Sequence, residues 1–462
     1  MNTVLEVTLF GADPWWVVLI KAVAIFVVVL VLTLFNIVFE RKVVGKMQHR
    51  LGPTMNGPGG SLQSLADGMK LMFKEDFRPK GADKVVFTLA PFVTSIPAIT
   101  AWAVIPLGGT VHIGSFSTNL QLTDLPVSVL FILAIGSIGV YGIVLAGWSS
   151  GSTYALLGGL RSSAQVISYE VAMGLSLVAV FLYAGSMSTH DIVEKQAQDI
   201  TFFGFHFPVW FCIQLIPSFI IYAISMVGEP NRAPFDLPEA EGELVGGFHT
   251  EYSGMRFAMF FMAEYINMST VSALAATLFL GGYKAPLPFN LVPALNNPWL
   301  GPIWLLAKVV ALIFVFVWLR GSLPRLRYDQ FMRLGWKFLI PISLIWIVLV
   351  AVLRAGMRQG WFTGPVMIAI AVVFLIAVVL TFVVGGTDEP EPAKRRAFDA
   401  FAGGYPVPPG AGEELPELAT VVPGTTEADP QAGPRRAADG QSARDVAMER
   451  EPARSRSAGE DS

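Results

Sequence analysis

Long apolar runs, separated by short polar stretches, recur along most of the chain. A transmembrane helix needs about 20 apolar residues to cross roughly 30 Å of hydrocarbon. Runs of this kind cover residues 15–39, 84–106, 126–147, 164–184, 208–228, 256–280, 302–320, 337–354 and 364–385. Backbone polar groups must be paired inside a bilayer, and the strand alternation of a membrane barrel is absent. The pattern therefore predicts an all-α, polytopic bundle of about nine transmembrane helices.

Residues 61–74 differ from these runs, because their apolar positions gather on one face of a helix. Leu62, Leu65, Met69, Met72 and Phe73 share that face, and polar side chains cover the rest. This pattern is typical of an amphipathic helix that lies at the membrane interface. Its apolar face packs on lipid, on a partner protein, or on both.

The composition changes after residue 385. Residues 386–462 are rich in Pro, Gly, Ala, Glu and Arg and poor in large apolar side chains. Such a segment cannot bury a core. We therefore predict a transmembrane domain over residues 1–385 and a disordered polar tail over residues 386–462.

Charge and cysteine content narrow the class of protein. Charged residues make up only 15% of the chain, against roughly 25% in an average soluble protein, which agrees with a surface that mostly faces lipid. Cys212 is the single cysteine, so no disulfide within the chain and no cysteine-ligated iron–sulfur cluster can form. The five histidines are scattered, and no pair has the spacing of a metal site.

Lysine and arginine gather in alternate loops. The first loop, residues 40–83, contains eight of them, whereas the second, residues 107–125, contains none. The positive-inside rule then places the odd-numbered loops in the cytoplasm and the N-terminus outside. Nine spans would leave the C-terminal tail in the cytoplasm.

The fifth loop, residues 229–255, combines many carboxyl groups with apolar bulk. Its acidic residues are Glu229, Asp236, Glu239, Glu241, Glu243 and Glu251. Apolar residues that argue for burial lie among them, namely Phe235, Leu237, Leu244, Val245 and Phe248. Crowded, partly desolvated carboxyl groups have raised pKa values and can exchange protons near neutral pH. The alternative is a solvated acidic loop.

Ionisable residues inside the predicted spans also indicate function, because they are costly in a bilayer. Glu170 and Glu264 lie in the fourth and sixth runs. A glutamate side chain is too short to reach the interface easily, so we expect these two to extend a proton relay from the acidic loop into the membrane. Lys21 is expected to reach the outer interface with its long side chain. For Lys308, the same behaviour and a functional role both remain open.

Several stretches together resemble one family. They are ERKVVGKMQHRLGP (40–53), LADGMKLMFKED (65–76), YALLGGLRSSAQVISYE (154–170), the fifth loop with the start of the next span (229–265), and LRGSLPRLRYDQFMRLGWK (319–337). These stretches are similar to the H subunit of the proton-pumping NADH:quinone oxidoreductase, respiratory complex I. The resemblance runs from about residue 15 to 354. A ninth apolar run and the polar tail depart from the eight-helix core of that family.

The resemblance implies a place for the chain in a larger enzyme. In that family this subunit joins the membrane arm to the peripheral arm and forms most of the access tunnel for ubiquinone or menaquinone, with the amphipathic helix near the entrance. Quinone is the substrate, and FMN and the iron–sulfur clusters belong to partner subunits. The partners implied are these other subunits, quinone and membrane lipids, with no nucleic acid. The implied location is the bacterial plasma (inner) membrane.

The resemblance also assigns roles to residues. The quinone tunnel is implied to include Arg41, Arg50, Arg232 and Asp236. The proton-coupling path is implied to consist of Glu170, Glu229, Glu239, Glu241, Glu243, Glu251 and Glu264. Further basic positions match at Arg161, Arg320, Arg325 and Arg327, where anchoring and a direct role remain open.

The implied function is to couple quinone reduction to proton translocation within a respiratory chain. The chain itself carries no redox centre. One alternative is the homologous subunit of a membrane-bound, hydrogenase-type complex, which shares this core. A second is a stand-alone ion transporter, which predicts inverted repeats that the sequence does not display.

Overall fold

The computed structural model describes residues 13–113, 116–197, 199–202, 205–208, 210–237, 241–286, 289 and 293–359. The chain divides into two units, Met1–Gly364 and Pro365–Ser462, and every described element lies in the first. The ninth predicted span, residues 364–385, and the predicted tail, residues 386–462, lie outside the described residues. The division of the chain at residue 385 therefore stays a prediction.

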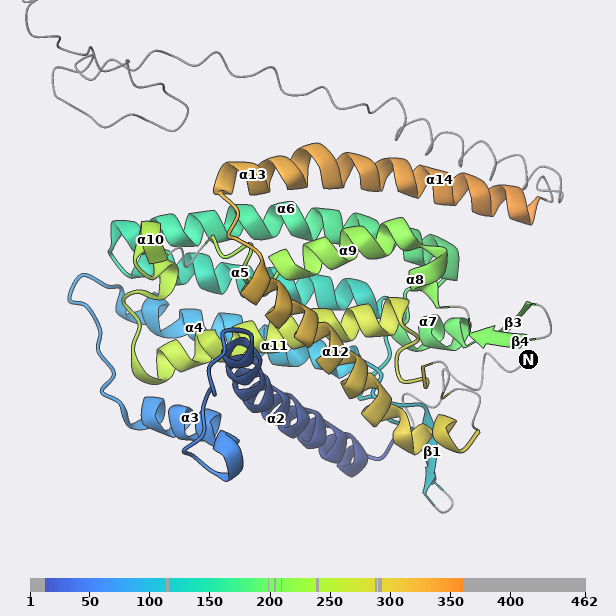
Figure 1. Ribbon diagram of the computed structural model, residues 1–462, viewed down its shortest axis with the longest axis horizontal. Coiled ribbons are helices and arrows are strands. Elements are labelled where there is room, and N and C mark those ends of the chain that lie inside the picture. The colour runs from blue at the N-terminus through green and yellow to red at the C-terminus, as the bar shows by residue number, and fades with distance from the viewer. Residues whose placement is uncertain are drawn as a thin grey trace, which may run out of the picture. The chain divides into compact units, whose positions relative to one another are not determined.

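Helices make up most of the described fold (Figure 1). The long helices are α2 (Trp15–Met47), α4 (Lys84–Thr100), α5 (Ser128–Ser149), α6 (Thr153–Ala184), α11 (Gly254–Phe279), α12 (Gly301–Ser322) and α14 (Ile340–Arg358). The shorter helices are α3 (Gln63–Phe73), α7 (Thr189–Gln196), α8 (Phe211–Gln214), α9 (Ile216–Gly228), α10 (Glu241–Leu244) and α13 (Tyr328–Arg333). Single 3-10 turns occur at Pro58–Gly60, Ala101–Val104, Gly247–His249, Pro293–Asn296 and Pro298–Leu300, and a π-helical turn, Leu334–Leu339, joins α13 to α14.

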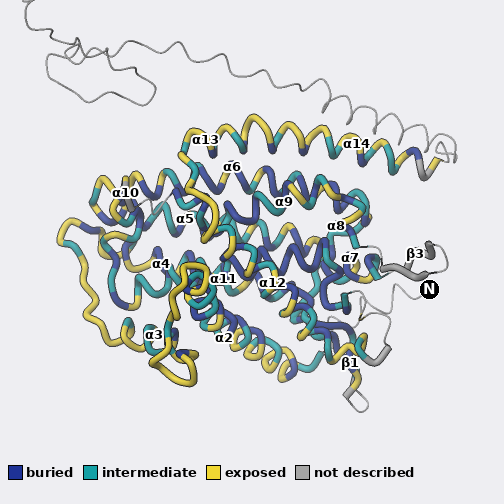
Figure 2. Tube along the Cα trace, viewed as in Figure 1, coloured by how far each residue is buried: buried dark blue, intermediate teal, exposed yellow. Residues whose placement is uncertain are grey.

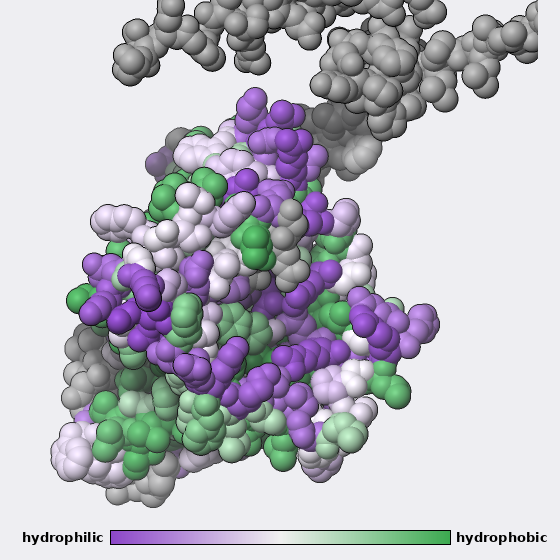
Figure 3. Space-filling model, turned by 90° about the vertical axis from the view of Figure 1, so that its left-hand side faces the viewer, coloured by the Kyte–Doolittle hydropathy of each residue, from purple (hydrophilic) through white to green (hydrophobic). Residues whose placement is uncertain are grey.

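Two small antiparallel hairpins lie at one end of the bundle. Strand β1 (Thr110–Ile113) pairs with β2 (Phe116–Asn119), with Thr110 opposite Asn119. Strand β3 (Asp199–Phe202) pairs with β4 (Phe205–Pro208). At the opposite end lie α3, α10 and the loops that follow α2, α9 and α12 (Figure 1). We call this the α3 end. Hydrophilic side chains gather over it, with hydrophobic ones along its lower edge (Figure 3).

Among the residues that the structure describes, six helical segments are long and apolar enough to cross a membrane. They are Trp15–Met47, Lys84–Val104, Ser128–Ser149, Thr153–Ala184, Pro298–Ser322 and Tyr328–Gly356. An all-α membrane bundle is confirmed at this level, but the count of about nine spans is not. The predicted span 208–228 begins beyond β4 with α8, and α9 has only 13 residues. The predicted span 256–280 is present as α11, but it is not among the six.

Helix α11 differs from the others because it lies inside the bundle. Almost every residue from Ala263 to Phe279 is buried (Figure 2). Its small polar side chains bind neighbouring helices, since Asn36 donates to Ser269 at 2.9 Å and the Trp102 indole donates to Thr270 at 2.8 Å. A helix that packs on protein on all sides needs no apolar surface toward lipid. Burial therefore explains why α11 is too polar to count as a membrane span by composition.

Small residues let α4, α5 and α6 approach closely. A Cβ added at Gly147 of α5 would lie 2.5 Å from the carbonyl oxygen of Ala155 on α6. A Cβ at Gly142 would lie 2.9 Å from the carbonyl oxygen of Ala90 on α4. Backbone atoms cannot move aside as a flexible side chain can, so these contacts require glycine. Close packing of this kind is typical of helices in membranes.

The amphipathic helix predicted at residues 61–74 is observed as α3. Met69 and Phe73 on its apolar face are 53% and 80% exposed, whereas Leu62 and Leu65 line a groove toward α2. Arg41 on α2 pairs with Asp67 on α3 at 2.5 Å, which holds the two helices together on the polar side. The uncovered apolar face agrees with packing on lipid or on a partner protein.

Gly147→Ala should destabilise the protein, because the new methyl group meets a fixed carbonyl oxygen. Overpacking of this kind costs about 1–3 kcal/mol. Gly174→Ala on α6 is the matched control, since a Cβ there meets nothing within 4 Å. Thermal unfolding of the purified variants in detergent measures the difference. Equal midpoints for the two variants would contradict the close α5–α6 contact.

Candidate functional site

Arg232 lies at the centre of a buried cluster of charged side chains. It is 8% exposed and follows the end of α9. Its Nε lies 2.7 Å from Glu264 Oε1 on α11, and its Nη1 lies 3.5 Å from Glu40 Oε1 on α2. Its guanidinium also lies 4.2 Å from the ring centroid of Tyr265. One cation thus bridges two helices through two carboxylates.

Glu40 completes this cluster. It is 5% exposed, accepts a hydrogen bond of 2.6 Å from the Tyr265 hydroxyl, and pairs with Arg320 at the end of α12. Two arginines therefore face two carboxylates, Glu40 and Glu264. Buried charges are tolerated only when they are paired in this way. Any new charge beside the cluster must disturb this balance.

The loop that carries Arg232 is held by contacts of its own. Phe235 is buried beside the rings of Tyr169 and Phe331, with centroids 5.5 and 4.9 Å away. The Gln165 side chain on α6 donates to the carbonyl oxygens of Gly228 at 2.9 Å and Phe235 at 2.8 Å. These contacts confirm that apolar residues bury the start of the fifth loop. They also fix the backbone on both sides of Arg232.

Further along the fifth loop, Leu244 and Phe248 are buried as well. The expectation is wrong for Val245, which is 64% exposed where the backbone turns with a positive φ after α10.

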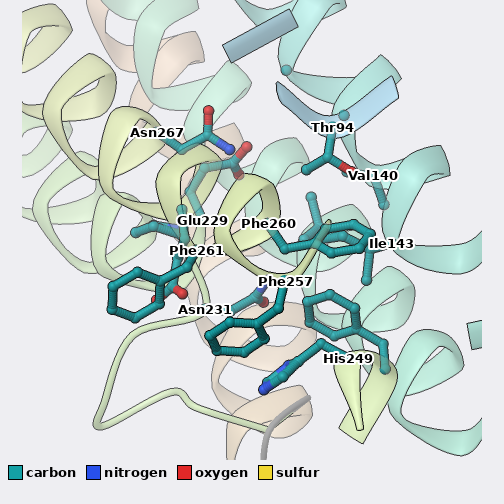
Figure 4. Close-up of a pocket in the computed structure, with 16 residues that line it drawn as sticks. Thr94, Val140, Ile143, Glu229, Asn231, His249, Phe257, Phe260, Phe261 and Asn267 are labelled. Carbon is teal, nitrogen blue, oxygen red and sulfur yellow. The ribbon is translucent and has the colours of Figure 1, made fainter. Parts of the chain in front are cut away.

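A small cavity lies beside the cluster (Figure 4). Its volume is about 50 Å³, and Glu229, Glu264 and Asn267 form its polar wall together with Thr94 and His249. Phenylalanines from α11, at 257, 260 and 261, supply the apolar wall. A cavity of this size has room for a few water molecules beside its polar wall, since each needs roughly 10–15 Å³. The carboxyls of Glu229 and Glu264 therefore face a common space that water can enter.

Glu229 also lines a second cavity, of about 30 Å³, which reaches Met173 on α6 and Thr270 on α11. Its Oε2 is buried without a hydrogen-bond partner among the described residues. Glu170, on α6, interacts electrostatically with Glu229 and accepts a hydrogen bond from Ser137 on α5. Three of the predicted glutamates, at 170, 229 and 264, are thus brought into one region of the interior.

Other predicted members of the glutamate path lie elsewhere. Glu243 on α10 is on the surface and pairs with Arg161 at 2.5 Å. The hydrogen bond from Arg161 holds the pKa of Glu243 below its usual value, so this group stays ionised at neutral pH. Glu251 is half-buried between the 3-10 turn Gly247–His249 and α11. Glu239 lies outside the described residues, and only the backbone of Glu241 is described, in α10.

The residues predicted to line the quinone tunnel lie in different environments. Arg232 belongs to the buried cluster, and Asp236 is half-buried in the same loop with Oδ1 inaccessible to solvent. Arg41 instead pairs with Asp67 on α3, and Arg50 donates to the Gln48 side chain in the exposed loop after α2. Of the further basic positions, Arg320 joins the cluster through Glu40, whereas Arg325 and Arg327 are exposed.

The two lysines considered from the sequence have different environments. Lys21 pairs with Asp13 at 2.5 Å. Lys308 is buried, and its ammonium donates to the carbonyl oxygens of Leu280, Gly282 and Lys284 at 2.7 to 2.8 Å. These carbonyls follow the C-terminus of α11, where a cation is favourable. The contacts of Lys308 therefore favour a structural role, which neither of its two sequence interpretations included.

Glu40 was not selected from the sequence, although a signal was present. The buried positions of α2 include Val29, Thr33, Asn36 and Glu40, which follow one another at helical spacing along one stripe. A carboxyl that continues an apolar stripe is a candidate for a buried ion pair. Asn267 and Thr94 carried no comparable signal. Within the described residues, no group of three His, Cys, Asp or Glu side chains is placed to hold a metal ion.

These features define a class of protein: an integral membrane helical bundle whose interior contains paired charges and small cavities. The chain belongs to the NADH dehydrogenase family, whose model matches residues 20–351. It is 54% identical to the H subunit of the NADH-quinone oxidoreductase of Cutibacterium acnes over 422 residues, which are 90% of this chain and 96% of the relative. It is 51% identical to the protein of the same name from Streptomyces avermitilis over 446 residues, 94% and 96% of the two chains.

The comparisons confirm the resemblance to the H subunit that the sequence motifs indicated. They also confirm the expectation that the chain is a subunit of an oxidoreductase. The matched residues include the whole described cluster, from Glu40 to Arg320.

Glu40→Gln should destabilise the protein, because it leaves Arg232 and Arg320 facing one carboxylate. Removing one partner of a buried pair costs about 3–5 kcal/mol. The double variant Glu40→Gln/Arg320→Gln restores the balance of charge and should regain part of the loss. Thermal unfolding of the two variants, with Arg320→Gln as the control, gives the coupling. A double variant whose loss of stability equals the sum of the losses of Glu40→Gln and Arg320→Gln would show that the two side chains are not coupled.

Proposed function

We propose that this chain is the membrane subunit of a proton-translocating NADH:quinone oxidoreductase that couples quinone reduction to proton pumping. The observation that carries the proposal is the position of Glu264. This carboxylate pairs with Arg232 on one side and lines the cavity that contains Glu229 on the other. A change in the pairing of Arg232 is thereby transmitted to a proton-binding group in the interior.

The proposed mechanism is electrostatic. Quinone binds on the side of Arg232 and Asp236, with Arg41 and Arg50 near the entrance to its tunnel. Reduction creates transient negative charge there, which attracts Arg232 away from Glu264. The Glu264 carboxylate then loses its counter-ion and binds a proton, because an uncompensated buried charge is costly. When Arg232 pairs with Glu264 again, the Glu264 carboxyl group releases the proton.

The released proton needs an onward path. Water in the two cavities would connect Glu264 to Glu229, and the electrostatic interaction between Glu229 and Glu170 extends the path to α6. We propose that Glu239, Glu241, Glu243 and Glu251 belong to the acidic approach at the α3 end, which supplies protons from the cytoplasm. Glu170 then lies toward the pump subunits.

The proposal also covers the setting of the chain. Its partners are the quinone-site subunits of the peripheral arm and the subunits of the membrane arm, and FMN and the iron–sulfur clusters belong to those partners. The α3 end faces the cytoplasm of a bacterial plasma membrane, with the N-terminus outside and the polar tail inside. The names of both relatives, each a subunit of an NADH-quinone oxidoreductase, support the proposed partner subunits. The excess of Lys and Arg in the odd-numbered loops supports the proposed orientation.

A hydrogenase-type complex remains the alternative enzyme. The two possibilities differ in their partner proteins, so purification of the tagged chain from its own cell separates them. Co-purification of an NADH-oxidising flavoprotein supports the proposal, and co-purification of a nickel–iron hydrogenase contradicts it.

Glu264→Gln and Glu170→Gln should each lower the proton pumping that accompanies quinone reduction. The amide side chain keeps the shape of the carboxyl group but cannot bind and release a proton. We expect a loss of about 100-fold, the lower end of what a positioned proton-transfer group contributes. NADH:quinone reductase activity and proton uptake in reconstituted vesicles measure it, with assembly checked by subunit content. Glu75→Gln, in the exposed loop after α3, is the control. Full pumping in both interior variants would rule out the relay.

A further inference from the structure

The two interior cavities share one wall. The residues that line both of them are Gly136 of α5, Glu229 directly after α9, and Asn267 of α11. In the close-up of the larger cavity, the side chains of Glu229 and Asn267 extend to the same end of it (Figure 4). A path for protons from one cavity to the other therefore passes between these three residues.

Polar side chains of α11 follow the cavities at regular spacing. Glu264 lines the larger cavity, Asn267 lines both, and Thr270 lines the smaller one. Residues three positions apart lie on one face of a helix, about 4.5 Å apart along its axis. Asn267 thus lies between the carboxyl group that pairs with Arg232 and the smaller cavity.

The Asn267 amide differs from the next polar group on α11 in its hydrogen bonds. The Thr270 hydroxyl accepts from the Trp102 indole at 2.8 Å and donates to the carbonyl oxygen of Ile266 at 2.9 Å. The Asn267 side chain makes no hydrogen bond to any residue that the structure describes. Polar groups in a protein interior are normally bonded to protein or to ordered water. The carbonyl oxygen and the N–H groups of this amide are therefore available to water in the two cavities.

Gly136 leaves space on the opposite side of this junction. A Cβ at this position would meet Glu229 Oε1 at 3.7 Å, and no backbone atom outside α5 lies within 4 Å of it. Close helix packing therefore does not require glycine here, as it does at Gly147. A larger side chain would instead project toward the Glu229 carboxyl group and fill the junction between the cavities.

We propose that Asn267 is a positioning residue that orients water between Glu264 and Glu229, and that Gly136 keeps the junction of the two cavities open. This inference rests on the function proposed above. The protonated Glu264 carboxyl group gives its proton to a water molecule, and that water passes one of its own protons on to the Glu229 carboxylate. The Asn267 amide holds the water by hydrogen bonds and neither gains nor loses a proton.

Asn267→Leu tests the amide, because leucine has a similar size but forms no side-chain hydrogen bond. Loss of one hydrogen bond to the proton-carrying water should slow quinone reduction and proton uptake about tenfold in the intact complex in vesicles. Slower proton transfer should also raise the effect of D₂O on the rate, which a purely structural role would not change. Asn267→Ser keeps a donor and an acceptor and should recover most of the rate.

Gly136→Val tests the junction. The added side chain should displace water beside Glu229 and lower proton uptake as Asn267→Leu does. Gly174→Val on α6 is the matched control, since a Cβ there meets nothing within 4 Å and Gly174 lines neither cavity. Subunit content checks assembly of each variant. If Asn267→Leu does not assemble, Gly136→Val and its control decide.

A density map of the intact complex that shows ordered water gives a test that does not depend on activity. Water is expected within about 3.2 Å of the Asn267 amide, on the sides of both carboxyl groups.

Three results would overturn the proposal and leave the proposed function intact, provided that Glu264→Gln still loses proton uptake. They are full uptake with an unchanged D₂O effect in Asn267→Leu, equal uptake in Gly136→Val and Gly174→Val, and an Asn267 amide without ordered water. Full uptake in Glu264→Gln would instead contradict the relay itself, and the role of Asn267 with it.

Discussion

The pairing of Arg232 with Glu40 and Glu264 is the interaction on which the rest of the interior depends. A guanidinium that is 8% exposed must be compensated by carboxylates within a few ångströms. This requirement fixes the distance between α2 and α11, since Glu40 and Glu264 lie on those two helices. It also draws the loop after α9 into the bundle, because Arg232 belongs to that loop. A small rearrangement of one side chain thus changes the charge balance of three elements.

The polar character of α11 follows from the same constraint. A helix in the middle of the bundle can carry Glu264, because Arg232 pairs with it. It can also carry hydroxyl groups such as Ser269 and Thr270, which donate to the α11 backbone and accept from Asn36 and Trp102. The cavities beside Glu264 and Glu229 add room for water. Stability and proposed function therefore use the same residues: the groups that must be paired for the bundle to form are those whose pairing can respond to a charge.

The outer surface is organised more simply than the charged interior. On α2 and α3, apolar side chains remain uncovered wherever lipid or a partner can cover them, and cations line the groove between these helices. The two faces of α2 illustrate the difference. Glu40 on one face is buried and paired with Arg232 and Arg320, whereas Lys42 on the other face lines that groove on the outside of the bundle.

The sequence by itself determined the class of the protein, the position of most long helices, the amphipathic α3 and the burial of the start of the fifth loop, because hydrophobic runs and helical periodicity are local. It also indicated Glu170, Glu229 and Glu264. Only the tertiary structure decided that Glu40 pairs with Arg232, that α11 is central, and that Glu243 pairs with Arg161 at the surface. Those outcomes depend on contacts between residues up to 280 positions apart, such as Glu40 and Arg320, which no local pattern encodes.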